Sequence, residues 1–264
     1  MLVSYYNTIG AKCITVNHHL EQIAQAIFKS WFVDFEPFAK GDFIDSVLGE
    51  IPVGWRVVKL SDVATFESGY SYKSTELQKS RIAMATIKNF DRKCGFKIDG
   101  FKEIAISGKI KPTQYAKLYD VLVAHTDVTQ NADIIGNAEL LLSFGGYDKV
   151  IISLDLVNVR SKNIDLSSFV LASILRSSSF KTHALGFVNG TTVLHLSKKA
   201  LPEYMFALPI DTSILNSLNR LIEPIYIKIA DNMRENDKLK NLRDILLPKL
   251  MSGELSISDF DNAK

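Results

Sequence analysis

Cysteine is scarce in this sequence: the 264 residues contain only two, Cys13 and Cys94. Two cysteines cannot build a disulfide framework or a multi-cysteine zinc site, and such scarcity is typical of a reducing compartment. No run of about 18 apolar residues is present to form a membrane-spanning helix. The N-terminus also lacks the charged start and apolar core of a secretion signal. We therefore expect a cytoplasmic protein with no membrane partner.

Motifs that would indicate catalysis are missing as well. No GxGxxG string is present, and no GxxxxGK string followed by Ser or Thr, so the usual phosphate cradles are excluded. No GxSxG string positions a nucleophilic serine. Phe35-Glu36-Pro37-Phe38 and Glu223-Pro224-Ile225-Tyr226 have one proline each, so neither matches the Asn/Asp-Pro-Pro-aromatic turn expected of an amino-group methyltransferase. We expect no catalytic residue and no cofactor.

Residue types that bind metals are present, but their spacing is wrong. Residues 127–133 alternate oxygen-bearing side chains like the first half of a calcium loop. However, Ala132 replaces the required glycine, and Ala138 stands where the bidentate glutamate belongs. The five histidines show neither HExxH spacing nor clustering with cysteine. We expect no metal site.

Charge is distributed unevenly along the chain. The net charge is only +2, but the balance of Lys and Arg against Asp and Glu is −2 for residues 1–49, +5 for residues 50–210 and −1 for residues 211–264. Residues 73–117 alone contain 11 basic and 4 acidic residues. This excess favours a polyanionic partner, although an ordinary solvated face could have the same composition.

Both ends of the chain show the alternating four- and three-residue apolar spacing of a packed helix. The first pattern predicts a helix over Asn17 to Trp31. The second, from Leu218 to Leu250, predicts a longer helix in which Pro224 lies early and Gly253 marks the end. Each helix could pack on its own globular domain or on another helix, and polar residues in the second stripe would fix its register. The predicted seam residues are Leu20, Ile23, Ile27, Ile222, Ile225, Ile229, Asn232, Asn236, Leu239 and Leu246.

The middle of the chain changes to short β-type runs separated by Gly, Asn and Asp. After a linker from Pro37 to Gly54, these runs predict an α/β (mixed α+β) domain flanked by long coiled-coil-type helices. We divide the chain into residues 1–49, 50–210 and 211–264. Predicted strands are 55–58, 82–87, 121–124, 139–143, 150–159 and 191–196, and predicted short helices are 60–64 and 167–175.

Several strings resemble one protein family. Leu20-Glu21-Gln22-Ile23-Ala24-Gln25-Ala26-Ile27-Phe28-Lys29-Ser30-Trp31-Phe32-Val33-Asp34-Phe35 is similar to the end of the central conserved region in specificity (S) subunits of type I restriction-modification enzymes. Gly49-Glu50-Ile51-Pro52-Val53-Gly54-Trp55 resembles the entry to a target-recognition domain of that family. Leu242-Arg243-Asp244-Ile245-Leu246-Leu247-Pro248-Lys249-Leu250 resembles its distal conserved region. Internal landmarks are similar too, namely residues 121–127, 135–136 and 189–192.

The resemblance implies a non-catalytic subunit. Such a protein would bind double-stranded DNA for partner methylation (M) subunits and, in the full complex, for a restriction (R) subunit. Family members usually have two recognition domains, whereas this chain has one. It could therefore be a naturally short form or part of a split or truncated subunit. An apolar seam exposed at each end of a monomer would be unfavourable, so we expect a homodimer through the helices.

The residue types available for DNA binding fall into two groups. Basic side chains would neutralise phosphates, while amide, imidazole and hydroxyl side chains could contact base edges. No family motif assigns base contacts, so these residues are candidates by chemistry alone. They are Tyr70, Tyr72, Lys73, Lys88, Asn89, Arg92, Lys93, Lys97, Gln130, Asn189, Thr191, Thr192 and His195.

Two functions of other classes remain open at this point. A coiled-coil scaffold or interaction protein would have the same helices but would not bind nucleic acid. A stand-alone DNA enzyme would need a nuclease or methyltransferase motif, which the sequence lacks. DNA recognition within a type I system is the function we expect.

Overall fold

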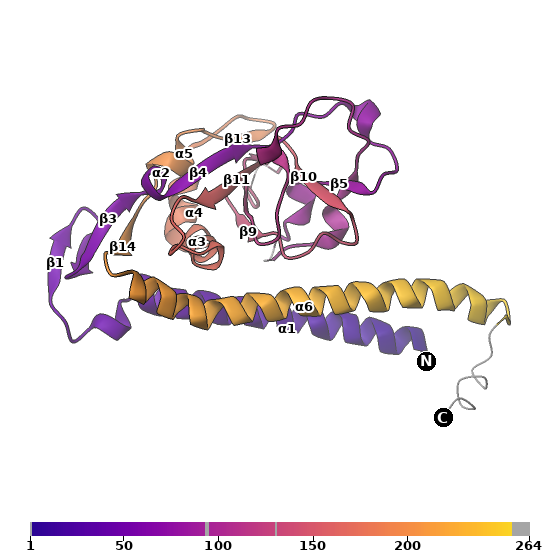
Figure 1. The fold of residues 1–264 in the computed structure, drawn as a ribbon, viewed down its shortest axis with the longest axis horizontal. Helices are drawn as coiled ribbons and strands as arrows, with labels where there is room; N and C mark the ends of the chain where they lie inside the picture. The colour runs from indigo at the N-terminus through magenta and orange to yellow at the C-terminus, as the bar shows by residue number, and fades with distance from the viewer. Residues whose placement is uncertain (1, 93–94, 130, 255–264) are drawn as a thin grey trace.

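The computed structural model describes residues 2–92, 95–129 and 131–254, with side chains from residue 15 onward. A β-rich body, residues 43–210, lies along one side of two long helices (Figure 1). This is a mixed α/β fold with a long C-terminal helix. Within the described residues, no helix is long and apolar enough to cross a membrane.

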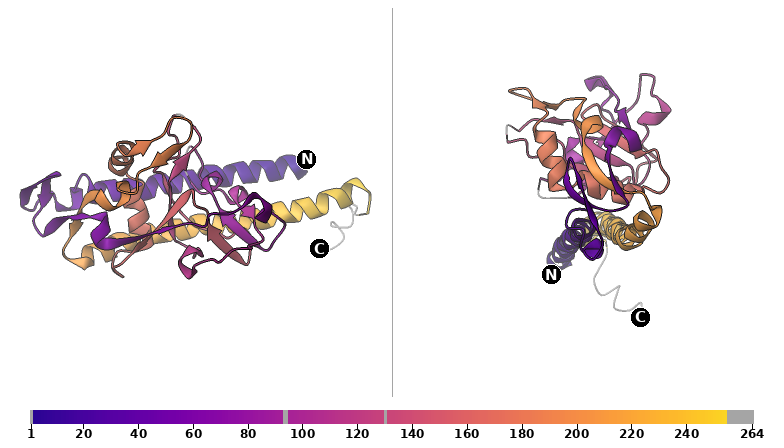
Figure 2. Two further views of the ribbon diagram at one scale, coloured as in Figure 1. Left: turned by 90° about the horizontal axis from the view of Figure 1, so that it is seen from above. Right: turned by 90° about the vertical axis from the view of Figure 1, so that its left-hand side faces the viewer.

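The two long helices are α1 (Leu2–Phe32) and α6 (Thr212–Met251). They lie side by side and run in opposite directions (Figures 1 and 2). Pro224 lies inside α6 without ending it, and the N-cap of α6 is Asp211, whose carboxylate accepts a hydrogen bond from the Ser213 amide. The α1 helix begins at Leu2, earlier than predicted, and includes Gly10 despite the weak helix propensity of glycine.

The stripe that α1 buries differs from the predicted seam. Ala24, Phe28 and Phe32 are buried, whereas Ile23 is half exposed and Leu20 and Ile27 lie at the edges of the contact. The buried stripe is thus rotated by one residue, about 100° around the helix. The reason is that α1 packs against both α6 and the β-rich body, and the large phenylalanine rings occupy the position between them.

The predicted seam of α6 fits the structure better. Ile222, Ile229 and Asn232 are buried, and Ile225 packs against the core from its edge. Farther along, Asn236, Leu239 and Leu246 are only partly buried. The first half of α6 belongs to the core of the body, because Leu215 and Leu218 share one hydrophobic cluster with α1, α3 and the sheets. The helices therefore cover each other within one chain, and this removes the argument for a dimer that rested on two exposed seams.

Among the described residues of the β-rich body, the strands form five small sheets. The four-stranded sheet has the order β4 (Ala64–Ser68), β11 (Leu156–Ser161), β7 (Val121–Ala124), β9 (Ala138–Leu140), all antiparallel. The three-stranded sheet β10 (Lys149–Ile152), β5 (Ile82–Ala85), β6 (Lys102–Glu103) contains the parallel pair β10–β5. A second three-stranded sheet has the order β12 (Val188–Asn189), β13 (Leu194–Leu196), β8 (Thr126–Asp127). The helices of the body are α2 (Leu60–Val63), α3 (Ser168–Leu175), α4 (Ser178–Leu185) and α5 (Ala200–Glu203).

Several segments differ from the prediction, among them the predicted strand at 191–196, which is a strand only at Leu194–Leu196. The expected linker contains the hairpin β1 (Phe43–Ser46) and β2 (Gly49–Pro52), which turns at Gly49 in the left-handed region at φ 95°. The expected single strand at 150–159 is two strands, β10 and β11, which belong to different sheets. The chain turns between them at residues 153–155, where the Leu156 amide donates to the Ser153 carbonyl.

An aromatic cluster joins α1 to the body. Trp55 begins β3 (Trp55–Lys59), which pairs with β14 (Met205–Pro209). The Trp55 ring centroid lies 4.9 Å from that of Phe32, 5.2 Å from that of Phe35 and 5.3 Å from that of Phe38. Edge-to-face contacts of this kind fix ring positions as well as burying apolar area. The two strings that resemble conserved family regions around residues 31–35 and 49–55 thus meet in space and have a structural role.

Candidate nucleic-acid interface

The small sheet β12–β13–β8 lies on the side of the body away from α6 (Figure 1). Cross-strand pairing places Asn189 of β12 directly opposite His195 of β13. Thr191 and Thr192 lie in the turn between these strands. All four side chains are exposed, so the structure brings four predicted DNA contacts onto one edge of the body.

Two residues that were not among the predicted contacts, His125 and Lys198, extend this edge. His125 precedes β8, and Lys198 follows β13. The pKa of His125 is lowered, chiefly by burial of the ring. Electrostatic repulsion from His195 and Lys198 lowers it further, while attraction to Asp155 acts in the opposite direction. Sequence spacing could not identify the group, because residues 125 and 195–198 meet only through the β8–β13 pairing.

The stretch that resembles half a calcium loop begins at the end of β8. Both carboxylate oxygens of Asp127 accept hydrogen bonds from the protein: one from the amide and hydroxyl of Thr129, each at 2.8 Å, and one from the amides of Ile134 and Ile135, at 2.7 and 3.2 Å. Partial burial alone would raise the pKa of Asp127, but these hydrogen bonds lower it. The carboxylate organises its own loop. Among the described residues, no three His, Cys, Asp or Glu side chains gather as metal ligands.

The basic segment 73–117 contains both exposed and ion-paired cations. Lys73, Lys88 and Arg92 are exposed. Lys97 lies beside the helix pair and its ammonium is 3.8 Å from the Asp91 carboxylate, so part of the charge excess is locally neutralised. Ion pairing within the segment and with its neighbours is a reason why a charge count overstates the surface potential. Two further candidates, Lys93 and Gln130, lie outside the described residues.

Tyr70 and Asn89 are not available for DNA contact. The Tyr70 hydroxyl donates to Glu76 Oε1 at 2.8 Å, and its ring is buried in a small apolar cluster. Asn89 is fully buried; its Oδ1 accepts from the Thr86 amide at 2.8 Å and its Nδ2 donates to the Lys97 carbonyl at 2.7 Å. Both predictions were wrong, because polar residue types were assigned to the surface without knowledge of internal partners. Tyr72 is partly exposed, and Lys102 lies over its ring.

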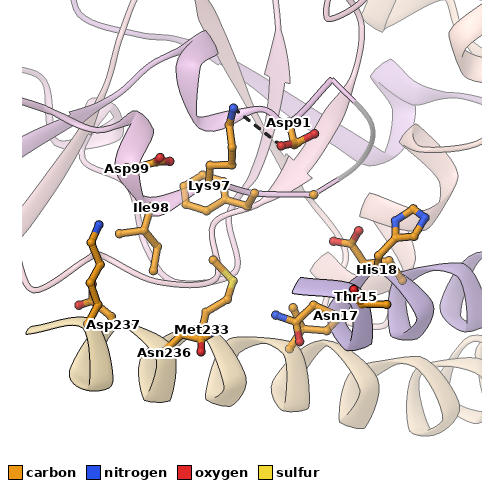
Figure 3. Close-up of a pocket in the computed structure, with 15 residues that line it drawn as sticks. Thr15, Asn17, His18, Asp91, Lys97, Ile98, Asp99, Met233, Asn236 and Asp237 are labelled. Atoms are coloured by element: carbon orange, nitrogen blue, oxygen red, sulfur yellow. Dashed lines mark ion pairs between the residues drawn. The ribbon is translucent and has the colours of Figure 1, made fainter. Parts of the chain in front are cut away.

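A cavity of about 610 Å³ separates residues 95–99 and Asp91 from the helix pair. Lys97 and Asp91 lie on its body side, Asn17 and His18 on α1, and Met233 on α6 (Figure 3). The lining is mixed, with both acidic and basic groups. It therefore lacks the uniform positive charge expected of a surface for nucleic acid.

A buried ion cluster lies where α1 contacts the β-rich body. The Arg176 guanidinium, at the end of α3, lies 3.2 Å from the carboxylate of Glu21 on α1 and 3.2 Å from that of Glu139 on β9. All three side chains are almost inaccessible to solvent. Burial raises the pKa of Glu139 to about 7, with Arg176 opposing and Glu21 adding to the shift. Among the described residues, two carboxyl groups of this cluster share the Arg176 guanidinium.

The fold is similar to that of a solved type I specificity subunit. The solved S subunit of the type I restriction-modification system of M. genitalium superposes with a TM-score of 0.55 at 12% identity, covering 94% of this chain and 58% of that chain. No protein-family model matches the chain.

Two type I specificity subunits are similar to this chain in sequence. The MjaIX type I specificity subunit of Methanocaldococcus jannaschii is 28% identical over 264 residues, covering 98% of this chain and 58% of the relative. The HindI type I specificity subunit of Haemophilus influenzae is 24% identical over 288 residues, covering 91% of this chain and 62% of the relative. The chain spans about three fifths of the length of these relatives. The resemblance to type I specificity subunits predicted from the sequence strings is therefore confirmed.

Proposed function

We propose that this chain is a DNA-recognition subunit of a type I restriction-modification system and reads one half of a bipartite target. The observation that carries the proposal is the similarity to two specificity subunits along nearly the whole chain. Methylation and cleavage then belong to partner M and R subunits, and the chain acts with them on DNA in the cytoplasm.

The β12–β13–β8 edge is our candidate for contact with the bases. It presents an amide, an imidazole and two hydroxyl groups on one exposed edge, beside Lys198. Such groups can donate and accept hydrogen bonds in the major groove, where each base pair has a distinct pattern. Exposed Lys73, Lys88 and Arg92 would add phosphate contacts, which position the protein but carry no sequence information.

The helix pair has a separate role in this proposal. Two rods of fixed length set the distance between two recognition domains and offer a surface on which M subunits dock. The described residues form one β-rich body, and reading a second half-site would require a second body. We propose that a second copy of the chain supplies it and that the contact lies at the free end of α6. Exposed Leu242 and Ile245 support that location.

Titration of the purified chain with mixed-sequence duplex DNA at several salt concentrations tests DNA binding. We expect affinity to fall steeply with salt, because cations released from the phosphates drive binding. Substituting Lys73, Arg92 and Lys93 by Ala should weaken binding to all sequences and reduce the log–log salt slope by up to about 3. Removing three exposed cations of α6, Arg220, Lys228 and Lys238, is the charge-matched control and should leave the slope nearly unchanged.

Two outcomes would contradict the proposal. Absence of salt-dependent binding would favour the alternative of a coiled-coil scaffold that does not bind nucleic acid. Equal slopes for the first triple variant and the wild-type chain would remove the basic segment from the contact. Methylation-site mapping in cells that contain the chain and its M subunits should then show a bipartite motif that disappears when the chain is deleted.

A further inference from the structure

Two loop tips meet at the exposed end of the β8–β13 pair. Asp127 lies opposite Leu194 in the register of these antiparallel strands. Continuing that register by one residue brings Val128 to the level of Val193. The Val128 side chain is 66% exposed and that of Val193 is 39% exposed. We call Val128, Val193, Thr191 and Thr192 the apolar tip, because all four are exposed β-branched residues that carry methyl groups.

Hydrogen bonds to Asp127 and from Lys181 hold the loop that follows Val128. Besides the four hydrogen bonds to the Asp127 carboxylate, the Lys181 ammonium of α4 reaches into the loop. It donates to the carbonyls of Ile135 at 2.7 Å and Ala132 at 3.1 Å, and to Oδ1 of Asn137 at 2.8 Å. Ala132 adopts the left-handed region at φ 55°, a conformation that persists when surrounding contacts impose it.

The turn that presents Val193 is equally constrained. Gly190 has φ 107°, and a Cβ at that position would lie 2.3 Å from the Val193 carbonyl oxygen. Glycine is therefore required for the tight approach of the two arms of the turn. A pair of rigid loops can place small side chains with the precision that recognition of a single chemical group needs.

The surroundings of the apolar tip indicate the type of surface it contacts. His195 and Lys198 flank it with positive or proton-donating groups, and Asn189 adds an amide. A patch of a few methyl groups is far smaller than the apolar centre of a protein interface. In the major groove, the 5-methyl of thymine is the apolar group among otherwise polar base edges, and small apolar side chains recognise it.

We propose that the apolar tip reads the 5-methyl group of a thymine in the major groove, and that Asp127 and Lys181 are positioning residues that hold Val128 in place. This rests on the proposed function in DNA recognition. It deepens that function, because it assigns one part of the surface to one base and one atom group.

Replacing thymine by uracil in the target duplex removes only the methyl group and tests the proposal directly. The target is first found by selection from random duplexes with the wild-type chain. Each thymine of the half-site is then replaced by deoxyuridine, one at a time. We expect one replacement to weaken wild-type binding about fourfold, the effect of one buried methyl. For the Val128→Ala and Val193→Ala variants, the ratio of the affinity for the thymine duplex to that for the deoxyuridine duplex should fall towards one.

Matched variants separate reading from folding. Val53→Ala, at another exposed valine in a turn, should keep the full sensitivity to deoxyuridine. Lys181→Met keeps the aliphatic stem but loses the hydrogen bonds. It should lower the ratio of specific to non-specific affinity while leaving the salt slope of non-specific binding unchanged, a result that general destabilisation would not give.

Failure of this inference differs from failure of the proposed function. A wild-type chain that selects a sequence but tolerates deoxyuridine at every position overturns the thymine assignment alone. The same holds if Val128→Ala retains full sensitivity. A wild-type chain that selects no sequence at all overturns the proposed function together with this inference.

Discussion

Asn232 Nδ2 on α6 donates a hydrogen bond to Asn17 Oδ1 on α1 at 2.8 Å, although 215 residues separate the two in the chain. Asn232 is only 6% exposed, so the bond is largely shielded from water. A buried polar pair of this kind lowers stability relative to two apolar residues but permits one alignment of the helices, since any other would leave the amides without partners. The asparagine predicted to fix the register of the second helix thus has its partner on the first.

A double-mutant cycle should detect this contact. We expect Asn17→Ala and Asn232→Ala each to reduce the free energy of unfolding by about 1 kcal/mol, with a coupling energy of about 0.5–1 kcal/mol. Urea denaturation of the two single variants and the double variant measures it. Asn216→Ala, at an exposed position of the same helix, is the control and should change stability little. Strictly additive losses would show that the two amides do not interact in solution.

The length of the helix pair should determine the spacer between two half-sites. Inserting seven residues into α1 before Thr15 and seven into α6 after Asn236 keeps the Asn17–Asn232 alignment and lengthens both rods by about 10 Å. At about 3.4 Å per base pair, the methylated motif should gain about three base pairs of spacer with the half-site sequences unchanged.

Single-helix insertions are the matched control for that experiment. Seven residues inserted into α6 alone have no matching insertion in α1 and shift the rest of α6 relative to α1. We therefore expect a lower melting temperature without a clean change of spacing. Methylation-site mapping reads the spacer in each case. An unchanged spacer in the folded double-insertion protein would contradict the role of the helices in setting distance.

Local patterns predicted several elements well. The strand at Val121–Ala124 was placed correctly because four consecutive buried apolar residues occur between turn signals. The helix at Ser168–Leu175 was found from its N-cap, where Ser167 Oγ accepts from the Val170 amide. The rotated stripe of α1 could not be predicted, because it depends on two surfaces that α1 contacts at once. The β1–β2 hairpin is mostly exposed and has little apolar alternation to reveal it.

The candidate interface was predictable only where its residues are close in sequence. Asn189, Thr191, Thr192 and His195 lie within one hairpin, so recognising the hairpin groups them. His125 joins them through a pairing between distant strands, which no local pattern encodes. Residue chemistry alone misassigned Asn89, since an amide serves equally well as an internal bridge.

The buried carboxyl of Glu139 should make stability depend on pH. Its pKa is raised from 4.5 to about 7, chiefly by burial, while Glu21 and Asp91 add to the shift and Arg176 opposes it. The folded state therefore binds this proton more tightly than the unfolded state does. Stability should fall as pH rises from about 4.5 to 7 and then level off with respect to this group.

Glu139→Gln mimics the protonated form of the carboxyl. In the wild-type chain the Gly95 amide donates a hydrogen bond to Glu139 Oε1 at 3.1 Å, and the glutamine keeps an oxygen that can accept this bond. We expect the variant to match the wild-type chain near pH 4.5 and to be more stable near pH 8, by on the order of 2 kcal/mol. Urea midpoints at several pH values measure this difference, and Glu235→Gln, at an exposed position on α6, serves as the control. A variant that is less stable than the wild-type chain at pH 8 would mean that the ionised carboxylate contributes net stability.

The free end of α6 allows a sharp test of the proposed homodimer. Leu242 is 46% exposed and Ile245 is 60% exposed, three residues apart on one face. Charging both, as Leu242→Glu with Ile245→Glu, should lower the solution mass from twice 29.5 kDa to 29.5 kDa without loss of helical signal. Leu221 is also 46% exposed and Ile227 is 37% exposed, but they lie on the half of α6 that packs against the body. Leu221→Glu with Ile227→Glu is therefore the matched control and should leave the mass unchanged. A wild-type chain with the mass of a monomer at micromolar concentration would contradict the proposed homodimer.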